Sequence, residues 1–156
     1  MQNGGKIRPA VFSELDRIVA LEDACFPRKL AYSRRQLRYL LLHAHSTVLL
    51  EIHQKIIRGF VIVLYRKGTS VAGIETIDVD PAYRNQGIGQ RLLAAAEEDI
   101  RQHGKKKIRL EVAMTNEAAI LLYKNAGFST TAVLKNYYLY NHEGSRDALR
   151  MVKEIS

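Results

Sequence analysis

The segment from Asp80 to Gly89 carries the pattern with the clearest chemical meaning. It reads Asp-Pro-Ala-Tyr-Arg-Asn-Gln-Gly-Ile-Gly and lies between a β-branched apolar run and an amphipathic run. Gly87 and Gly89 have no Cβ atom, so a ligand can approach the backbone closely there. A helix that starts at this point offers unpaired N–H groups and a partial positive charge. The segment could therefore bind a pyrophosphate. Polar and cationic side chains beside it are Arg84, Gln90 and Arg91.

Other functions of this segment must be weighed against phosphate binding. A glycine pair before a helix is also what a tight strand-to-helix turn requires, and the pattern alone leaves that alternative open. Two other phosphate motifs are excluded. The Gly-Lys-Ser/Thr of a Walker loop does not follow, and the third glycine of the dinucleotide motif Gly-x-Gly-x-x-Gly is missing.

The elements that must position this turn follow from the periodicity of apolar residues. Helical spacing predicts helices over residues 13–24, from 33 onwards, 87–103 and 116–125. Short β-branched or alternating runs predict strands at 7–10, 47–52, 56–65, 71–79, 108–112, 128–134 and 148–155. This order predicts an α/β (α+β) fold with a mixed, mostly antiparallel twisted sheet and helices on both faces.

Three helix ends have a local signature. Ser13 with Asp16, and Ser33 with Gln36, have the spacing of a capping box. Gly104 is expected to end the helix that starts at residue 87.

Length and composition agree with one domain over residues 1–156. A chain of 156 residues with 47% hydrophobic and 26% charged residues is typical of a globular protein. No apolar run approaches the roughly 18 residues of a membrane span, and no secretory signal is visible at the N-terminus. The single cysteine, Cys25, excludes an intramolecular disulfide and is interpreted as a core residue. We expect a cytoplasmic protein without a membrane partner.

The formal net charge of +8 predicts attraction to polyanions. Nucleic acid, a ribosome surface, an acidic peptide and a phosphorylated cofactor all qualify. Direct nucleic-acid binding is not required, since neither a base-stacking platform nor a helix-turn-helix pattern is present.

The motif and its surroundings together resemble the GNAT superfamily of N-acetyltransferases. Residues 84–89, Arg-Asn-Gln-Gly-Ile-Gly, match the family signature Arg/Gln-x-x-Gly-x-Gly/Ala. Residues 77–81, 110–112 and 116–128 are similar to the family's cofactor strand, next strand and next helix. Within the family, the chain is most similar to the ribosomal-protein-alanine N-acetyltransferase type. The segment Asn136-Tyr137-Tyr138 resembles the closing hairpin of that type. The resemblance implies a GNAT-like fold, acetyl-CoA as cosubstrate and no metal.

The resemblance also implies a cofactor site. The backbone of the central strand would pair with the pantetheine arm, and the Val79 N–H would donate to the thioester carbonyl, stabilising an oxyanion. The turn would hold the pyrophosphate. Asn116 matches a cofactor-contacting asparagine, although it could equally be a helix cap, and the two roles are compatible. The cofactor-binding residues expected on this basis are Ile77, Asp78, Val79, Arg84, Asn85, Gln86, Gly87, Ile88, Gly89, Gln90 and Asn116.

Two catalytic residues are carried over in the same way. Glu111 matches the family's proton acceptor, and the strand alternation places it opposite Ile108, Leu110 and Val112. Tyr123 matches the proton donor to coenzyme A. On the pattern alone, Glu111 could instead be a charged residue on a solvated face, and Tyr123 a core aromatic residue. If both assignments hold, the acetyl group is transferred directly, without an acyl-enzyme.

The acceptor is predicted to be the α-amino group of a protein N-terminus, with a ribosomal protein among the candidates. An α-amine has a reference pKa near 8 and lysine near 10.4, so at pH 7 the α-amine is the easier nucleophile. Tyr137 and Tyr138 would contact this substrate, or else pack at a strand end. Asp78 departs from the small or apolar residue of many relatives, and its effect beside the thioester is open. The alternatives are a small amine or a lysine side chain as acceptor, and an acetyl-CoA-binding module without activity.

Overall fold

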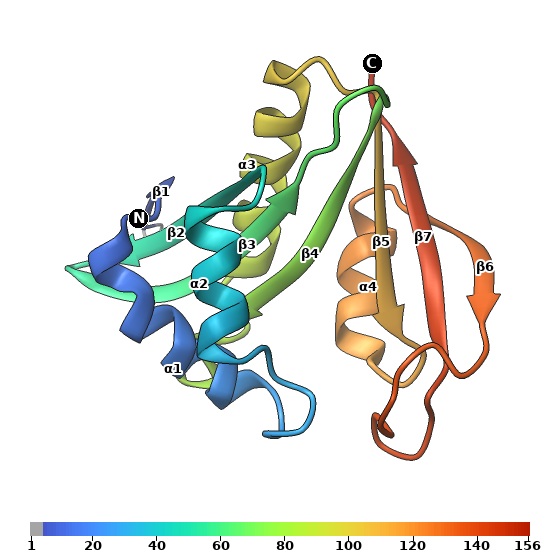
Figure 1. Ribbon diagram of the computed structural model, residues 1–156, viewed down its shortest axis with the longest axis horizontal. Coiled ribbons are helices and arrows are strands. Elements are labelled where there is room, and N and C mark those ends of the chain that lie inside the picture. The colour runs from blue at the N-terminus through green and yellow to red at the C-terminus, as the bar shows by residue number, and fades with distance from the viewer. Residues whose placement is uncertain (1–4) are drawn as a thin grey trace.

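One sheet of seven strands runs through residues 5–156, the part of the chain that the computed structural model describes (Figure 1). The strand order is β1-β2-β3-β4-β5-β7-β6. The strands are β1 Lys6–Pro9, β2 Ser46–His53, β3 Ile56–Leu64, β4 Val71–Val79, β5 Lys107–Ala113, β6 Ser129–Leu134 and β7 Ala148–Glu154. The α-helices are α1 Leu15–Cys25, α2 Arg34–Leu42, α3 Ile88–Gln102 and α4 Glu117–Asn125.

The pairing of these strands confirms a mixed, mostly antiparallel sheet. Among the strands of residues 5–156, only β4 and β5 pair in parallel, and helix α3 makes the crossover between them. Strand β7 comes last in the chain but lies between β5 and β6. The predicted order of helices and strands is confirmed.

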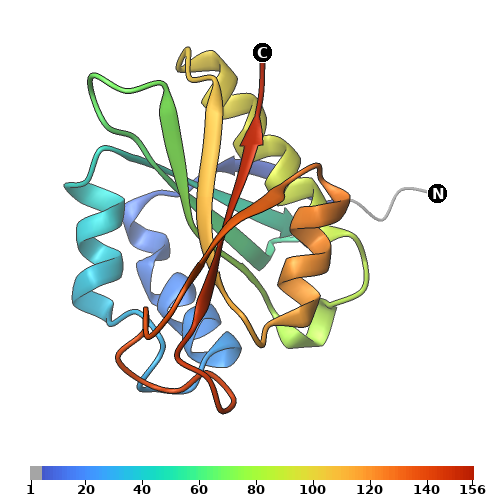
Figure 2. The same ribbon diagram turned by 90° about the vertical axis from the view of Figure 1, so that its right-hand side faces the viewer.

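Helices cover both faces of the sheet, α1 and α2 on one and α3 and α4 on the other (Figures 1 and 2). Strand β3 shows the reason, because its successive residues are buried on opposite faces. Phe60 and Ile62 pack with α1 and α2, whereas Val61 and Val63 pack with α3. A strand buried on both sides reads as a continuous apolar run.

The helix ends agree in part with the predicted signatures. At α2 the capping box is confirmed: the Ser33 hydroxyl accepts from the Gln36 N–H at 3.1 Å, and the Gln36 amide oxygen accepts from the Ser33 N–H at 2.7 Å. Gly104 has φ +73° and follows α3, as predicted.

The box expected from Ser13 and Asp16 is wrong. Ser13 lies inside a short 3₁₀ turn, η1 Phe12–Glu14, that precedes α1. The Glu14 carboxylate accepts from the Val11 N–H at 2.8 Å, and Arg8 holds that carboxylate by a hydrogen bond of 3.0 Å. Arg8 lies in β1, six residues before Glu14, and its contact places the helix start at an acidic residue that the expected capping box did not indicate.

Candidate active site

Strands β4 and β5 pair over only part of their length. Val71–Gly73 pair with Lys107–Arg109, and within residues 5–156 the ladder does not continue toward Val79 and Ala113. Figure 1 shows the two strands diverging. Glu75 is an extra residue in β4 relative to β3, and such a bulge increases the local bend and twist. The far half of β4 therefore has one edge available to an added strand-like ligand.

The Val79 N–H faces this unpaired edge. The Asp80 N–H donates to the Arg58 carbonyl of β3 at 2.8 Å, so the Val79 carbonyl in the same peptide points away from β3. In an extended strand, the N–H and C=O of one residue point to the same edge, so the Val79 N–H also points away from β3. The direction fits the predicted donor to a thioester carbonyl.

The turn after β4 has the form of an anion site. A short 3₁₀ turn, η2 Pro81–Tyr83, leads into it, and Asn85 and Gly87 have φ +64° and +77°. Gly87 is the N-cap of α3 and brings no side chain to accept the N–H groups of the first turn. These N–H groups and the positive end of the helix dipole can bind an anion. Asn85, Gln86 and Gln90 are exposed, and Ile88 is buried.

The Asp78 side chain points toward α1. It is buried there against Glu22. Within residues 5–156, Oε1 of Glu22 and Oδ2 of Asp78 have no hydrogen-bond partner. Burial, together with the charge of Asp78, raises the pKa of Glu22 to about 9, and burial also raises the pKa of Asp78. Glu22 is therefore expected to keep its proton near neutral pH, and a protonated carboxyl can donate to the neighbouring Asp78. The sequence showed that Asp78 departs from the small or apolar residue of many relatives, but it did not indicate Glu22 as the partner of Asp78.

Cys25 differs from its interpretation as a core residue. It is half-buried at the end of α1, and its Sγ donates to the Val79 carbonyl at 3.3 Å. Arg84 Nε donates to the same carbonyl at 3.2 Å, and its guanidinium approaches the Cys25 sulfur at 3.5 Å. Burial and the charge of Asp78 raise the pKa of Cys25 to about 11. A thiol of this kind is a poor nucleophile near neutral pH.

Glu111 lies on the sheet face opposite the core residues Ile108, Leu110 and Val112, as the alternation predicted. Its side chain is 19% exposed, and Arg150 on β7 is its direct cross-strand partner. Arg150 Nε donates to Glu111 Oε2 at 2.9 Å, and Arg109 Nε lies 3.4 Å from the same oxygen. No local sequence signal indicates Arg150, since the contact depends on the register of β5 with β7.

Tyr123 is a buried residue of α4, and its ring packs against Phe128 with centroids 5.7 Å apart. Its hydroxyl makes no hydrogen bond within residues 5–156. Burial, followed by the charges of Asp78 and Tyr138, raises its pKa. The phenol is therefore neutral near pH 7 and keeps a proton to donate.

Tyr137 and Tyr138 lie in the loop between β6 and β7. Their rings meet edge to face at 5.0 Å, and Tyr138 is fixed by its backbone bond to Arg146 at 3.0 Å. Burial, followed by the carboxylates of Glu111 and Glu75, raises the pKa of Tyr137. This loop and the one between α1 and α2 lie at the end of the molecule where β4 and β5 diverge (Figures 1 and 2).

The loop between α1 and α2 contributes Tyr32. The Tyr32 hydroxyl donates to Glu75 of β4, and the Tyr32 N–H donates to Glu22 at 2.9 Å. A cavity of about 350 Å³ lies beside this contact, lined by Tyr32, Arg35, Gln36, Tyr39, Leu40 and Glu75. No local sequence signal indicates the contact of Tyr32 with Glu75, which lies 43 residues away in the chain.

Asn116 is the N-cap of α4, and its side chain accepts from the Ala119 N–H at 3.2 Å. The capping role is therefore established, and a contact with a cofactor stays a prediction. Within residues 5–156 no group of three His, Cys, Asp or Glu side chains is placed to hold a metal ion, and no helix there has the length and apolar character to span a bilayer.

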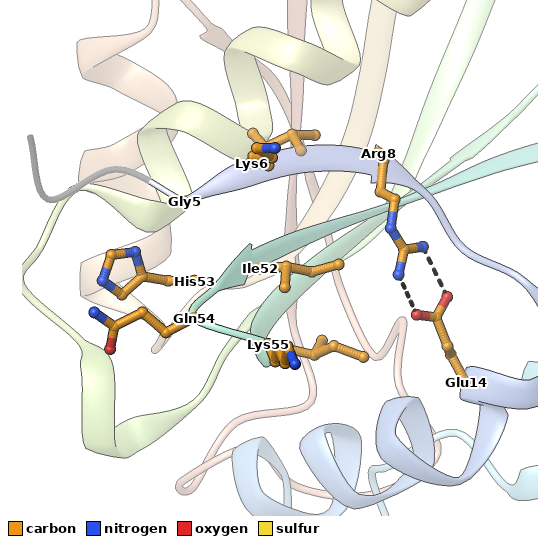
Figure 3. A pocket seen from close by; sticks show the side chains of 10 residues that line it. Gly5, Lys6, Arg8, Glu14, Ile52, His53, Gln54 and Lys55 are labelled. Atoms are coloured by element: carbon orange, nitrogen blue, oxygen red, sulfur yellow. Dashed lines mark hydrogen bonds and ion pairs between the residues drawn. The ribbon is translucent and has the colours of Figure 1, made fainter.

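A second cavity of about 640 Å³ lies elsewhere, against β1 and the turn between β2 and β3 (Figure 3). Arg8 and Glu14 form an ion pair at its margin, and Lys6, His53 and Lys55 also line it. None of the predicted site residues lines this cavity. The larger of these two cavities therefore lies away from the predicted site residues.

Comparison with known proteins identifies the family. The Acetyltransferase (GNAT) family matches residues 15–128. The [ribosomal protein bS18]-alanine N-acetyltransferase of Escherichia coli K12 is 38% identical over 85 residues, which are 54% of this chain and 57% of that protein. The crystal structure of the Escherichia coli ribosomal-protein-S18-alanine N-acetyltransferase superposes with a TM-score of 0.86 at 25% identity, covering 97% of this chain and 94% of that one. The crystal structure of Ard1 from Thermoplasma volcanium superposes with a TM-score of 0.86 at 25% identity, covering 98% of this chain and 99% of that one.

The chain belongs to the GNAT acetyltransferase family. The open edge of β4 and the glycine turn lie within the matched residues, as do Glu111 and Tyr123. The sequence match spans a little over half the length of the bS18-alanine N-acetyltransferases that the chain resembles.

Proposed function

We propose that this protein transfers an acetyl group from acetyl-CoA to the α-amino group of a protein N-terminus. One observation carries the proposal. Strand β4 diverges from β5 and is followed by the glycine turn before α3, where no side chain caps the helix N-terminus. An unpaired strand edge followed by a helix N-terminus suits a ligand that has an amide-containing arm and a pyrophosphate.

The cofactor would lie along β4 and across the turn, where it supplies an activated thioester. The Val79 N–H would stabilise negative charge on the thioester oxygen, and the turn would hold the pyrophosphate. The residues proposed for this role are Ile77, Asp78, Val79, Arg84, Asn85, Gln86, Gly87, Ile88, Gly89, Gln90 and Asn116. For Asp78 the role is confined to its backbone, because its side chain is turned toward Glu22.

Glu111 is proposed to accept the proton of the incoming amine, directly or through a water molecule. Its carboxylate is held in one orientation by Arg150. Tyr123 would donate its proton to the departing thiolate, since its hydroxyl is neutral and unpaired within the described chain. The raised pKa of Cys25 fits direct transfer to the amine without an acyl-enzyme.

A peptide acceptor is favoured over a small amine by the surroundings of this site. Tyr137, Tyr138 and Tyr32 come from two loops at one end of the sheet, and the cavity of about 350 Å³ beside Tyr32 offers room beyond the reacting amine. The bS18-alanine N-acetyltransferases, which the chain resembles, act on a ribosomal protein. A ribosomal protein N-terminus in the cytoplasm is therefore the first substrate to test.

The test is release of coenzyme A from acetyl-CoA in the presence of short peptides. Peptides that start with Ala, Ser or Met are compared with the same peptides blocked at the α-amine. We expect turnover that disappears on blocking. Turnover with small amines or lysine side chains instead would contradict the proposed acceptor, and binding of acetyl-CoA without any turnover would contradict the enzymatic role.

A further inference from the structure

A buried cluster of charged residues lies beside the turn, and the proposed reaction does not use it. Its centre is Glu51 of β2, which is fully buried. Glu51 accepts from Arg58 Nε of β3 at 2.9 Å, from Arg91 Nη2 of α3 at 2.8 Å and from the Gly5 N–H at 3.0 Å. One carboxylate thus connects two arginines from different elements.

Arg91 links this cluster to the turn. While Nη2 bonds Glu51, Nη1 donates to the Gln86 carbonyl at 3.1 Å. The Gln86 carbonyl and the Gly87 N–H belong to one planar trans peptide, so they point in opposite directions. Holding the carbonyl therefore sets the direction of the Gly87 N–H. A bond to a cation also polarises the peptide and strengthens that N–H as a donor.

Arg58 fixes the beginning of the same turn. Its carbonyl accepts from the Asp80 N–H at 2.8 Å, and its guanidinium lies 5.7 Å from the centre of the Tyr83 ring. The turn has left-handed residues at Asn85 and Gly87 and so lacks the regular hydrogen bonds of a strand or helix. Its shape depends on contacts of this kind from outside.

We propose that Glu51 and Arg91 are positioning residues that aim the Gly87 N–H at the pyrophosphate of acetyl-CoA. This inference rests on the proposed function and adds to it two residues that need not touch the cofactor. The sequence suggested that Arg91 supplies a donor beside the turn. The structure directs two of its donors to protein oxygens, one of which belongs to the turn itself.

A direct electrostatic role for Arg91 makes the opposite prediction, which allows a sharp test. Glu51→Gln removes a negative charge near the turn but also removes the carboxylate that orients Arg91. If Arg91 acted only through its charge, this variant would bind the anionic coenzyme A as tightly as the wild type or more tightly. If positioning matters, the variant binds coenzyme A more weakly.

Arg91→Lys is the second variant, because Glu51→Gln leaves Arg58 buried without its carboxylate and could prevent folding. Lysine keeps the charge but has no planar fork to bridge Glu51 and Gln86. Arg101→Lys is the matched control, since Arg101 lies on the same helix in an exposed ion pair with Glu97.

The measurements are dissociation constants of coenzyme A by calorimetry and of pantetheine by NMR titration. We expect Glu51→Gln and Arg91→Lys to weaken coenzyme A binding about tenfold, the loss of roughly one charge-assisted hydrogen bond. Pantetheine, which lacks the pyrophosphate, is expected to bind all variants within about twofold of the wild type, and Arg101→Lys is expected to bind both ligands normally.

Three results would overturn the inference: undiminished coenzyme A binding by Glu51→Gln, identical behaviour of Arg91→Lys and Arg101→Lys, or an equal loss for pantetheine. The last would show a general structural defect. Failure of the wild type itself to bind coenzyme A would overturn the proposed function, a result distinct from any difference among the variants.

Discussion

Two kinds of carboxyl environment lie close to the proposed reaction. Glu111 is flanked by the guanidinium groups of Arg150 and Arg109. Glu22 and Asp78 are buried against each other, where a charge on one disfavours a charge on the other. Of these three carboxyls, Glu111 alone is partly exposed, as its proposed role as proton acceptor requires, whereas the buried pair connects α1 to β4.

Glu111→Gln is expected to lower kcat by about two to three orders of magnitude, because the amide cannot accept the proton of the amine. Tyr123→Phe is expected to lower kcat as well, with a smaller effect if water can protonate the thiolate. Steady-state kinetics and the dissociation constant of coenzyme A would be measured together. Glu98→Gln, an exposed change on α3, is the control. A normal kcat for Glu111→Gln would exclude Glu111 as the proton acceptor.

The buried pair predicts a pH-dependent stability. The folded-state pKa of Glu22 is about 9, above the reference value of 4.5, so the folded protein binds this proton more tightly than the unfolded protein. The contribution of Glu22 to the free energy of unfolding is complete below about pH 4.5 and is lost as the pH rises toward 9. Asp78, Asp23 and the Tyr32 N–H also act on this carboxyl, and Cys25 with Arg84 lies nearby.

Thermal unfolding measured between pH 6 and pH 9 tests this point. We expect the wild-type Tm to fall over this range more steeply than the Tm of Glu22→Gln, because glutamine resembles the protonated acid and cannot ionise. Parallel curves for the two proteins would mean that Glu22 does not hold a proton in the folded state.

At the scale of the elements, two helix starts with similar sequence patterns are stabilised in different ways. α2 begins at Ser33, where the hydroxyl and the Gln36 side chain satisfy each other's backbone N–H groups. α1 begins after a 3₁₀ turn fixed by Glu14 and Arg8. Both sites have a serine three residues before a polar residue, but only one is a capping box.

A pair of serine variants tests this difference. Ser33→Ala is expected to lower the free energy of unfolding by about 1 kcal/mol, the usual value of an N-cap hydroxyl. Ser13→Ala is expected to change it by less than about 0.5 kcal/mol. Denaturant unfolding would measure both. Equal losses would show that Ser13 caps α1 after all.

At the scale of the whole molecule, the opening between β4 and β5 lies between the two halves of the sheet, and the proposed cofactor would occupy it. Within the described part of the chain, β4 and β5 pair only at Val71–Gly73 with Lys107–Arg109, so a ligand placed beyond these residues would contact both halves of the sheet. Such a ligand stabilises the folded state by mass action.

Coenzyme A is therefore expected to raise the Tm of the wild type. At a concentration of about 100 times its Kd it adds about 2.7 kcal/mol. For a chain of this size this corresponds to roughly 5–10 °C. Differential scanning fluorimetry with coenzyme A, and with pantothenate as the control, would measure the shift. No shift at saturating coenzyme A would contradict a cofactor site at this opening.

The sequence by itself determined the features that depend on neighbours along the chain. The strand and helix order, the Ser33 cap, the end of α3 at Gly104 and the turn at Gly87 all follow from short-range patterns, and the GNAT resemblance rests on the same segments. The catalytic roles of Glu111 and Tyr123 stay predictions that the fold accommodates.

Only the tertiary structure decided which charged groups meet. The contacts of Glu111 with Arg150, Glu51 with Arg91 and Tyr32 with Glu75 join residues 39, 40 and 43 positions apart. Strand register and helix packing bring them together, and a change of one residue in register would turn the side chain to the other face. The interpretation of Cys25 as a core residue was wrong because the burial of its side chain depends on where α1 ends against β4.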